Sequence, residues 1–238
     1  SLVRECTART LDSIVSFGER LSAEIVAAAF REQGRSARAV DARSLVVTDQ
    51  AFGAARVDFG RTDARIRNWW QDETALPVVT GFIGATEAGE TTTLGRGGSD
   101  YTAAIFGAAL RAEAIEIWTD VDGVMSADPR IVPTAFSLDS LRYDELMELS
   151  HFGAKVVYPP TVHPARAKNI PLVIKNTLSP AFNGTWIREE APPAPMGVRG
   201  VASISNVALL RLEGDGMVGV PGFAMRLFGA LARREVSV

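Results

Sequence analysis

The sequence has 238 residues, of which 47% are hydrophobic, and a formal net charge of −3, so it can form one large domain or a large and a small one. Its 25 basic residues are scattered and its apolar runs stay below the ~18 residues of a membrane span, which excludes a nucleic-acid-binding stripe and a membrane anchor. The single cysteine, Cys6, excludes an internal disulfide and indicates a reducing, cytoplasmic setting.

The first part of the chain is predicted to alternate helices and strands. Residues 7–33 have the apolar spacing of a helix that ends near Gly34. Residues 37–47 suit a strand, and residues 58–72 suit a hairpin arm followed by a helix. The run at 76–84 predicts a buried strand that leads into a loop. The apolar residues of the first helix recur at three- and four-residue steps: Leu11, Ile14, Leu21, Ile25, Ala28 and Ala29.

A second series of elements completes the main domain, which we place at residues 1–188. In chain order we expect a turn-rich segment at 87–93, a helix at 101–110, a buried strand at 114–119, a loop at 120–133, a helix at 141–150 and a strand at 172–175. Alternating strands and helices predict an α/β fold with a mostly parallel sheet.

A Pro- and Glu-rich linker at 189–196 separates this domain from a smaller α+β module at 197–238. We expect strands at 198–204 and 207–212, a glycine-rich segment at 214–222, a helix at 223–234 and the start of a strand at 236–238. The sequence stops before this module is complete, and it begins without a Met on an amphipathic pattern. We therefore expect a fragment of a longer protein.

The segment G-R-G-G-S-D at 95–100 is a candidate anion-binding turn. Its glycines let backbone amides approach an anion, and the following helix start adds unpaired N–H groups. Arg96 supplies a planar fork for a carboxylate or phosphate. A purely structural turn with Ser99 or Asp100 as the helix N-cap is about equally consistent with the glycine content. The segment matches neither the Walker nor the Rossmann pattern.

The segment W-T-D-V-D-G-V-M-S-A-D-P-R at 118–130 follows a buried strand, where parallel sheets usually bind ligands. Its acidic residues suit hydroxyls or the waters of Mg²⁺, and Arg130 suits a phosphate. Taken one by one, the Asp residues fit a structural Asx-rich loop better than a ligand site. Lys155 and Glu19 are weaker candidates, for a phosphate and an ammonium group respectively. The two histidines suggest neither a catalytic triad nor a metal site, and we predict no metal ligands.

These segments together resemble the aspartate kinases. Residues 92–100 match T-T-L-G-R-G-G-S-D, and residues 118–130 resemble W-T-D-V-x-G-[VIL]-x-[TS]-x-D-P-R. Residues 152–159 resemble F-G-A-K-V-[LV]-[HY]-P, residues 17–22 resemble F-G-E-[RL]-L-S, and residues 81–84 match G-F-I-G. The resemblance covers about residues 10–187, with all five motifs in the family's order. From 197 onward the chain is similar to the start of an ACT regulatory region, in the version found in kinases fused to homoserine dehydrogenase.

The resemblance implies the amino-acid kinase fold, with a mostly parallel central sheet between helix layers. It implies transfer of the ATP γ-phosphoryl group, with Mg²⁺, to the side-chain carboxylate of L-aspartate. Glu19 would bind the aspartate ammonium group, while Arg96, Gly97, Gly98 and Ser99 would bind its carboxylate. Asp100 would order the active-site lysines, and the catalytic residues would be Asp100, Arg96 and Lys155. The implied nucleotide contacts are Thr119, Asp120, Met125, Arg130, Lys155 and Val156.

The resemblance also implies a homo-oligomer, an amino-acid effector (threonine or lysine) at the ACT region, and a role in lysine, threonine and methionine biosynthesis. Two departures matter. Met125 stands where the family usually has an aromatic residue, and the family's opening Lys-Phe-Gly-Gly-[TS]-Ser loop is absent. Without that loop we expect a weak or inactive polypeptide. Two alternatives are another acyl-phosphate-forming or uridylate kinase-like enzyme, and a non-catalytic amino-acid sensor.

Overall fold

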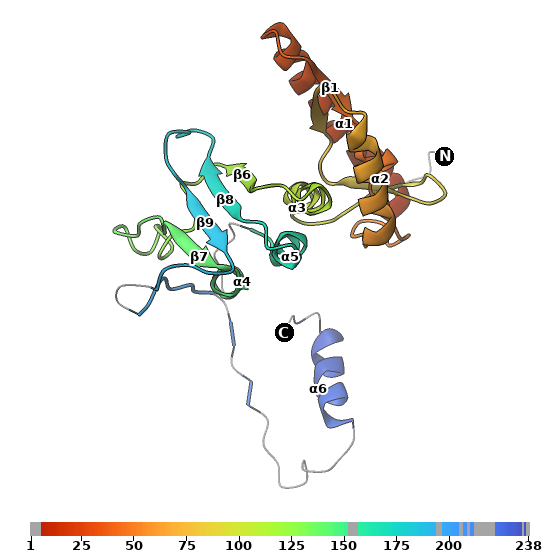
Figure 1. Cartoon of the computed structure of the whole chain (residues 1–238). Coiled ribbons are helices and arrows are strands. Elements are labelled where there is room, and N and C mark those ends of the chain that lie inside the picture. The colour runs from red at the N-terminus through yellow and green to blue at the C-terminus, as the bar shows by residue number, and fades with distance from the viewer. Residues whose placement is uncertain are drawn as a thin grey trace. The chain divides into compact units, whose positions relative to one another are not determined.

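The structure of the chain, a computed structural model, describes residues 6–151, 157–193, 197–204, 207–208, 210–211, 222–234 and 236. The chain divides into two compact units, Ser1–Ser203 and Ile204–Val238 (Figure 1). The described part of the smaller unit includes helix α6 (Phe223–Ala232), which confirms the helix expected there. The glycine-rich segment at 214–222 lies almost wholly outside the described residues, as do the ends of the strands expected at 207–212 and 236–238.

The larger unit contains the predicted succession of helices and strands. Its first elements are α1 (Ala8–Glu32), β1 (Ala37–Val40), the short 3₁₀ helix η1 (Ala42–Ser44), β2 (Val47–Thr48), α2 (Phe59–Gln71), β3 (Leu76–Val79), β4 (Ile83–Thr86) and β5 (Thr91–Thr93). They are followed by α3 (Gly98–Leu110), β6 (Ile115–Thr119), β7 (Ser140–Arg142), α4 (Tyr143–His151), α5 (Pro159–Ala167), β8 (Leu172–Asn176) and β9 (Thr185–Arg188).

The strands form three sheets in which parallel pairs predominate. β1 pairs with β3 in parallel, and β2 pairs with β4 in parallel while β5 joins β4 as an antiparallel hairpin. The third sheet has the order β6-β8-β9-β7, with β8–β9 as its antiparallel pair. In this sheet Thr119 at the end of β6 lies opposite Asn176 at the end of β8. The α/β fold class is therefore confirmed, with short separate sheets in place of one continuous sheet.

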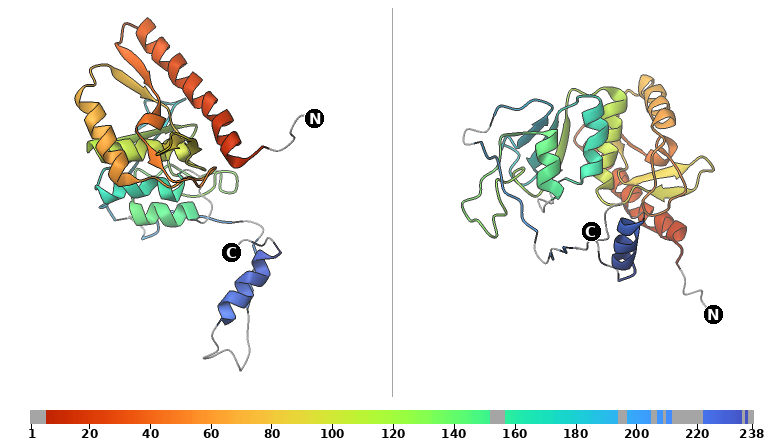
Figure 2. Two further views of the ribbon diagram at one scale, coloured as in Figure 1. Left: turned by 90° about the vertical axis from the view of Figure 1, so that its right-hand side faces the viewer. Right: turned by 90° about the horizontal axis from the view of Figure 1, so that it is seen from below.

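Helix α3 lies between two hydrophobic cores and contributes one face to each. Ala104 and Ala108 belong to the core around the β6–β9 sheet, whereas Ile105 and Ala109 belong to the core under β4 and α2. Figures 1 and 2 show α5 running beside α3 on the side of the β6–β9 sheet. A helix buried on two faces needs small and apolar side chains nearly all round, which explains the composition of residues 101–110.

Helix α1 buries a different face from the one that its large apolar residues suggest. Its buried residues are Asp12, Ser16, Ala23 and Ala27, a helical stripe with steps of about four residues. The large side chains of the predicted pattern lie outward, and Leu21 and Ile25 are 62% and 68% exposed. The helix prediction is confirmed, but the covered face is small and polar.

Several details of the chain differ from the sequence prediction. The run at 76–84 forms two strands, because Phe82 turns the chain between sheets with a left-handed φ of 67°. Its amide donates to Thr102 Oγ1 at 3.0 Å, and its carbonyl accepts a hydrogen bond from the Leu94 amide at 2.8 Å. The sequence did not predict β7, β9 or α5. The hairpin arm expected before α2 is reduced to one antiparallel bridge, between Thr48 and Val57, after which Asp58 caps the helix.

The strand predicted at 198–204 is wrong, because this segment has no regular structure in the described residues. The division between the compact units falls after Ser203, within the module that we expected to start at 197. The domain assignment itself remains a prediction. None of the helices in the described part of the chain has the length and apolarity that a membrane span requires.

Candidate active site

The first part of the site lies on the covered face of α1. Glu19 is partly buried there, one helical turn from Ser16 and Ala23. Burial raises the pKa of the Glu19 carboxyl, and a hydrogen bond from the Gly81 backbone partly offsets that increase. This contact brings together two segments that lie far apart in the sequence, the F-G-E motif and the G-F-I-G motif.

Gly81 also lies against the glycine-rich loop. A Cβ added at Gly81 would come within 2.9 Å of Ser99 Oγ, closer than real Cβ contacts allow. The loop is held in turn by the Thr102 hydroxyl, which donates to the Gly98 carbonyl at 2.9 Å. Glu19, Gly81 and Ser99 therefore form one continuous surface, as a binding site assembled from three motifs requires.

The glycine loop ends in a helix start that side chains leave open. Gly97 is the N-cap of α3 with a left-handed φ of 67°, and among the described residues no side chain caps this helix. The alternative of Ser99 or Asp100 as the N-cap is therefore wrong. A Cβ at Gly97 would lie 2.7 Å from the Cβ of Tyr158, so Tyr158, near the end of the 152–159 motif, also packs against the glycine loop. Uncapped N–H groups at a helix start favour an anion.

Arg96 and Asp100 carry charges on either side of this helix start. In the described part of the chain neither side chain takes part in an ion pair. Arg96 is exposed, whereas Asp100 is half-buried in the first turn of α3, and burial raises the pKa of its carboxyl. An exposed guanidinium and a partly buried carboxylate beside an open helix start can bind a ligand that carries both signs of charge.

Asp12 fixes the strand that leads into the glycine loop. Its carboxylate is 2% exposed and accepts hydrogen bonds from the Gly53 amide at 2.9 Å, the Thr93 amide at 3.0 Å and the Thr93 hydroxyl at 2.8 Å. Thr93 is the last residue of β5, directly before the loop. The sequence analysis overlooked Asp12, although an acidic residue on the inner face of an amphipathic helix is a usable signal.

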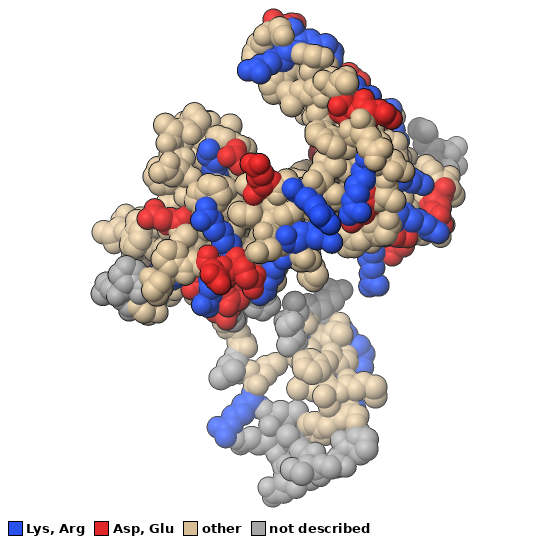
Figure 3. Space-filling model, viewed as in Figure 1, with Lys and Arg blue, Asp and Glu red and all other residues tan. Residues whose placement is uncertain are grey.

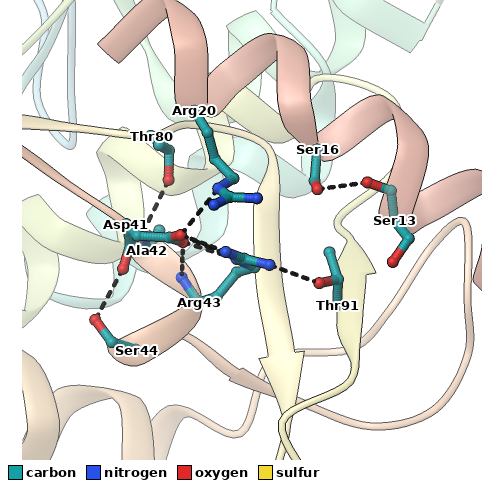
Figure 4. Close-up of polar contacts among 9 residues, drawn as sticks. All are labelled: Ser13, Ser16, Arg20, Asp41, Ala42, Arg43, Ser44, Thr80 and Thr91. Atoms are coloured by element: carbon teal, nitrogen blue, oxygen red, sulfur yellow. Dashed lines mark hydrogen bonds and ion pairs between the residues drawn. The ribbon is translucent and has the colours of Figure 1, made fainter. Parts of the chain in front are cut away.

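A second polar network, also missed, lies where β1 and β3 end. Figure 4 shows Arg20 of α1 and Arg43 of η1 converging on the Asp41 carboxylate, with Nε–Oδ2 at 3.4 Å and Nη2–Oδ2 at 2.6 Å. Burial alone would raise the pKa of Asp41, but the two guanidinium groups hold it below its ordinary value. Arg43 also donates to Thr91 Oγ1 at 2.9 Å, and Thr80 accepts from the Ala42 amide at 2.9 Å. This network fixes α1 beside the ends of β1, β3 and β5.

The second part of the site is a pocket beyond the carboxyl end of β6. Its volume is about 320 Å³, within the roughly 300–1,000 Å³ typical of small-molecule sites. Four predicted nucleotide contacts line it: Thr119, Asp120, Met125 and Arg130. Apolar side chains, among them Leu149 and Val201, form much of the remaining lining. The structure thus brings the predicted nucleotide residues of the 118–130 loop into one concave surface.

Arg130 is held at the rim of this pocket by Asp128. Its Nη2 lies 2.7 Å from Asp128 Oδ2, and its side chain is 87% exposed. The Arg130 guanidinium holds the pKa of Asp128 below its ordinary value. Because an exposed pair of this kind is worth little in water, Arg130 can exchange its partner for a phosphate at small cost.

The end of β8 adds two polar residues, Lys175 and Asn176, that were not among the site residues predicted from the sequence. Asn176 donates to Asp122 Oδ1 at 2.8 Å and accepts from the Leu178 amide at 2.8 Å, which fastens the loop after β6. The Lys175 ammonium lies 4.6 Å from the centre of the Trp118 ring and 3.5 Å from Glu116 Oε1. Polar residues directly after a buried parallel strand were the available signal.

Lys155 and Val156, predicted at the nucleotide, lie outside the described residues, so their roles stay predictions. The described residues contain no group of three or more His, Cys, Asp or Glu side chains placed to hold a metal ion. A Mg²⁺ ion that is bound mainly through nucleotide phosphates needs only one or two carboxylates from the protein. Asp120 lies suitably at the pocket for that purpose.

The family model described as the amino acid kinase family matches residues 3–176. The chain belongs to the amino acid kinase family. Among curated members it is 41% identical over 229 residues to bifunctional aspartokinase/homoserine dehydrogenase 2, chloroplastic, of Arabidopsis thaliana, which covers 92% of this chain and 25% of that protein. It is 36% identical over 243 residues to aspartokinase 3, chloroplastic, of the same organism, covering 100% of this chain and 44% of that protein.

Solved members of the family share the fold described above. The aspartokinase III of E. coli in complex with aspartate and ADP (R-state) aligns with a TM-score of 0.83 and 34% identity, covering 99% of this chain and 53% of that one. Its complex with lysine and aspartate (T-state) aligns with a TM-score of 0.79. The chain thus spans between a quarter and about half of the length of these relatives.

Proposed function

We propose that this chain belongs to the catalytic part of an aspartate kinase, which transfers the ATP γ-phosphoryl group to the side-chain carboxylate of L-aspartate. The observation that carries the proposal is the convergence of Glu19, Gly81 and Ser99 on one surface beside an open helix start. The similarity to aspartokinase 3 of Arabidopsis thaliana, and to an E. coli aspartokinase structure that contains aspartate and ADP, supports the same conclusion.

The aspartate site is proposed at the glycine loop. Glu19 pairs with the substrate ammonium group, and Arg96 binds a carboxylate together with the amides of Gly97, Gly98 and Ser99. The left-handed Gly97 and the missing side-chain cap support this assignment, since both leave amides available to an anion. Burial raises the pKa of Asp100, and a nearby cation would stabilise its ionised form. We propose that this cation is the ammonium group of Lys155.

The nucleotide site is proposed at the pocket of the 118–130 loop. Thr119 and Asp120 contact the nucleotide, and Met125 gives an apolar surface for the base in place of the usual aromatic ring. Arg130 leaves Asp128 to bind phosphate, and Lys155 and Val156 close around the nucleotide. Asp120 would hold the Mg²⁺ that accompanies ATP, and the ion would neutralise charge on the phosphates.

The chemistry follows from the charges. The aspartate carboxylate is already a nucleophile, so the protein needs no general base. Its task is to bring two anions into line and to stabilise the charge of the transferring phosphoryl group. The proposed aspartate site supplies Arg96 and the α3 amides for this task. The proposed nucleotide site supplies Arg130 and Lys155.

The test is the kinetics of Arg96→Ala, measured as ATP-dependent aspartyl hydroxamate formation. We expect the aspartate KM to rise at least about tenfold, because a charge-assisted contact of about 1.5–3 kcal/mol is lost. The ATP KM should change little. Near-normal aspartate kinetics in this variant would exclude the assignment. Failure of the unchanged chain to bind aspartate and ADP, with threonine or lysine still bound, would favour the sensor alternative instead.

We propose the residues from 197 onward as the start of an ACT-type regulatory region with threonine or lysine as effector. The structure of E. coli aspartokinase III in complex with lysine and aspartate supports an amino-acid effector. We also propose that the enzyme acts at the start of lysine, threonine and methionine biosynthesis, as a homo-oligomer. The cytoplasmic location remains a prediction from the single cysteine.

A further inference from the structure

The segment that leads out of the larger unit forms one side of the candidate nucleotide pocket. Val201, Ala202 and Ser203 line the pocket together with the 118–130 loop. The next residue, Ile204, begins the second compact unit. We call residues 199–203 the linker wall. A pocket wall made from the connection between two units can respond to both of them.

The first attachment of the linker wall is the Arg199 side chain, which is 15% exposed. Its Nε donates to Glu145 Oε1 at 2.6 Å, and its Nη1 donates to the Ser140 carbonyl at 3.1 Å. Its Nη2 donates to the Pro192 carbonyl, so one guanidinium holds both ends of the 192–199 segment. A planar fork with several fixed acceptors gives a more rigid attachment than a lysine could.

Glu145, the main partner of Arg199, is itself fixed at the start of α4. Its other carboxylate oxygen accepts the Arg142 amide at 2.8 Å. Figure 3 shows acidic side chains gathered over α4, whose first turn contains Asp144 and Glu145. The wall is therefore attached to a rigid helix, and the same helix contributes Leu149 to the pocket.

The second attachment joins the linker wall directly to the nucleotide loop. The Val201 amide donates to the Ser126 carbonyl at 2.8 Å. Ser126 is itself held by Phe136, whose carbonyl accepts the Ser126 amide at 2.8 Å and whose amide donates to Ser126 Oγ at 3.1 Å. The close approach depends on Gly200, because a Cβ there would lie 3.0 Å from the Ser126 carbonyl oxygen. A side chain at this position would push the wall away from the loop.

We propose that the linker wall sets the nucleotide affinity of this chain, with Arg199 and Gly200 as positioning residues that act through Val201 and Ser126. The inference rests on the proposed nucleotide site.

The experiment measures binding of Mg²⁺-ADP and of aspartate to the whole chain by isothermal titration calorimetry. The variants are Gly200→Ala and Arg199→Ala. Gly60→Ala is the control for the glycine, since a Cβ there meets only Asp58 Oδ1 at an ordinary 3.5 Å. Arg142→Ala is the control for the arginine, since its side chain pairs with Asp144 on the same surface. Exchange of the Val201 amide with deuterium reports the attachment itself.

We expect both linker variants to raise the Kd of Mg²⁺-ADP about tenfold, which corresponds to the loss of one hydrogen bond, that of Val201 with Ser126. The Kd of aspartate should stay within about twofold of that of the unchanged chain. The Val201 amide should exchange faster in both variants, and neither control should show these changes. Unaltered ADP binding in both variants, with normal binding by the unchanged chain, would overturn the inference and leave the proposed function standing. If the unchanged chain binds no ADP, the nucleotide site and the linker wall are both wrong.

Discussion

The buried carboxylate of Asp12 offers the sharpest test of how the glycine loop is held. Asp12→Ala removes the acceptor for three hydrogen bonds, from the Gly53 amide, the Thr93 amide and the Thr93 hydroxyl. The hydroxyl can turn to another acceptor, but the two amides cannot. An unsatisfied buried donor costs about 1–3 kcal/mol, so the two amides together predict a loss of about 2–6 kcal/mol in unfolding free energy.

Asp12→Asn separates the charge from the geometry. The amides of Gly53 and Thr93 both bind Asp12 Oδ2, so an Asn carbonyl in that place keeps both bonds, and its amino group faces the Thr93 hydroxyl. Because the hydrogen bonds lose the assistance of the charge, we expect the unfolding free energy to fall by about 1–3 kcal/mol. Ser16→Ala is the matched control on the same buried face. Its hydroxyl donates only within its own helix, to the Ser13 carbonyl, and we expect a change within about 0.5 kcal/mol.

The assay is urea unfolding followed by tryptophan fluorescence. All four tryptophans lie within Ser1–Ser203, so the signal reports the unit that contains Asp12. The urea midpoint should be highest for Ser16→Ala, lower for Asp12→Asn and lowest for Asp12→Ala. The slope of the unfolding free energy against urea concentration should not change. If Asp12→Ala unfolds within about 0.5 kcal/mol of Ser16→Ala, the carboxylate does not hold the loop and the reasoning fails.

Three further predictions concern single side chains. In urea unfolding, Gly97→Ala should lower the unfolding free energy by about 1 kcal/mol more than Gly34→Ala does. Both glycines have a positive φ, but of the two only a Cβ at Gly97 would clash, with Tyr158. Burial raises the pKa of Asp100, so its ionised form destabilises the fold. Asp100→Asn should therefore raise the Tm at neutral pH and leave it unchanged below pH 3.8, where the carboxyl is protonated in both states. Burial raises the pKa of Tyr143 to about 12, so stability should fall as the pH rises from 10.0 to about 12, and Tyr143→Phe should remove that loss in alkaline thermal unfolding.

Local patterns predicted the long elements well, for physical reasons. The helical spacing of residues 7–33 and the small apolar residues of 101–110 predicted α1 and α3 almost to their ends. The short strands β7 and β9 were missed because their pairing is a long-range contact without a strong local signal. Helix α5 was missed although two prolines stand at its start, where they fit a helix.

The local sequence did not determine which face of α1 is covered. Leu21 and Ile25 gave the expected apolar period, yet the covered stripe contains Asp12 and Ser16. A buried carboxylate is tolerated there because the Thr93 and Gly53 amides meet it, and those partners lie far away in the chain. Asp41 is partly buried and has one such distant partner, Arg20 of α1, beside its near neighbour Arg43.

The sequence by itself determined the chemistry of this protein: a glycine loop, an arginine, an acidic helix start and a polar loop after a buried strand, in an order that resembles the aspartate kinases. Only the tertiary structure decided that Glu19, Gly81 and Ser99 share one surface, and that residues 201–203 line the pocket of the 118–130 loop. Motif residues are set by the chemistry of the groups they bind and can be recognised locally. Contacts such as that of Val201 with Ser126 depend on chain geometry, which local sequence patterns do not specify.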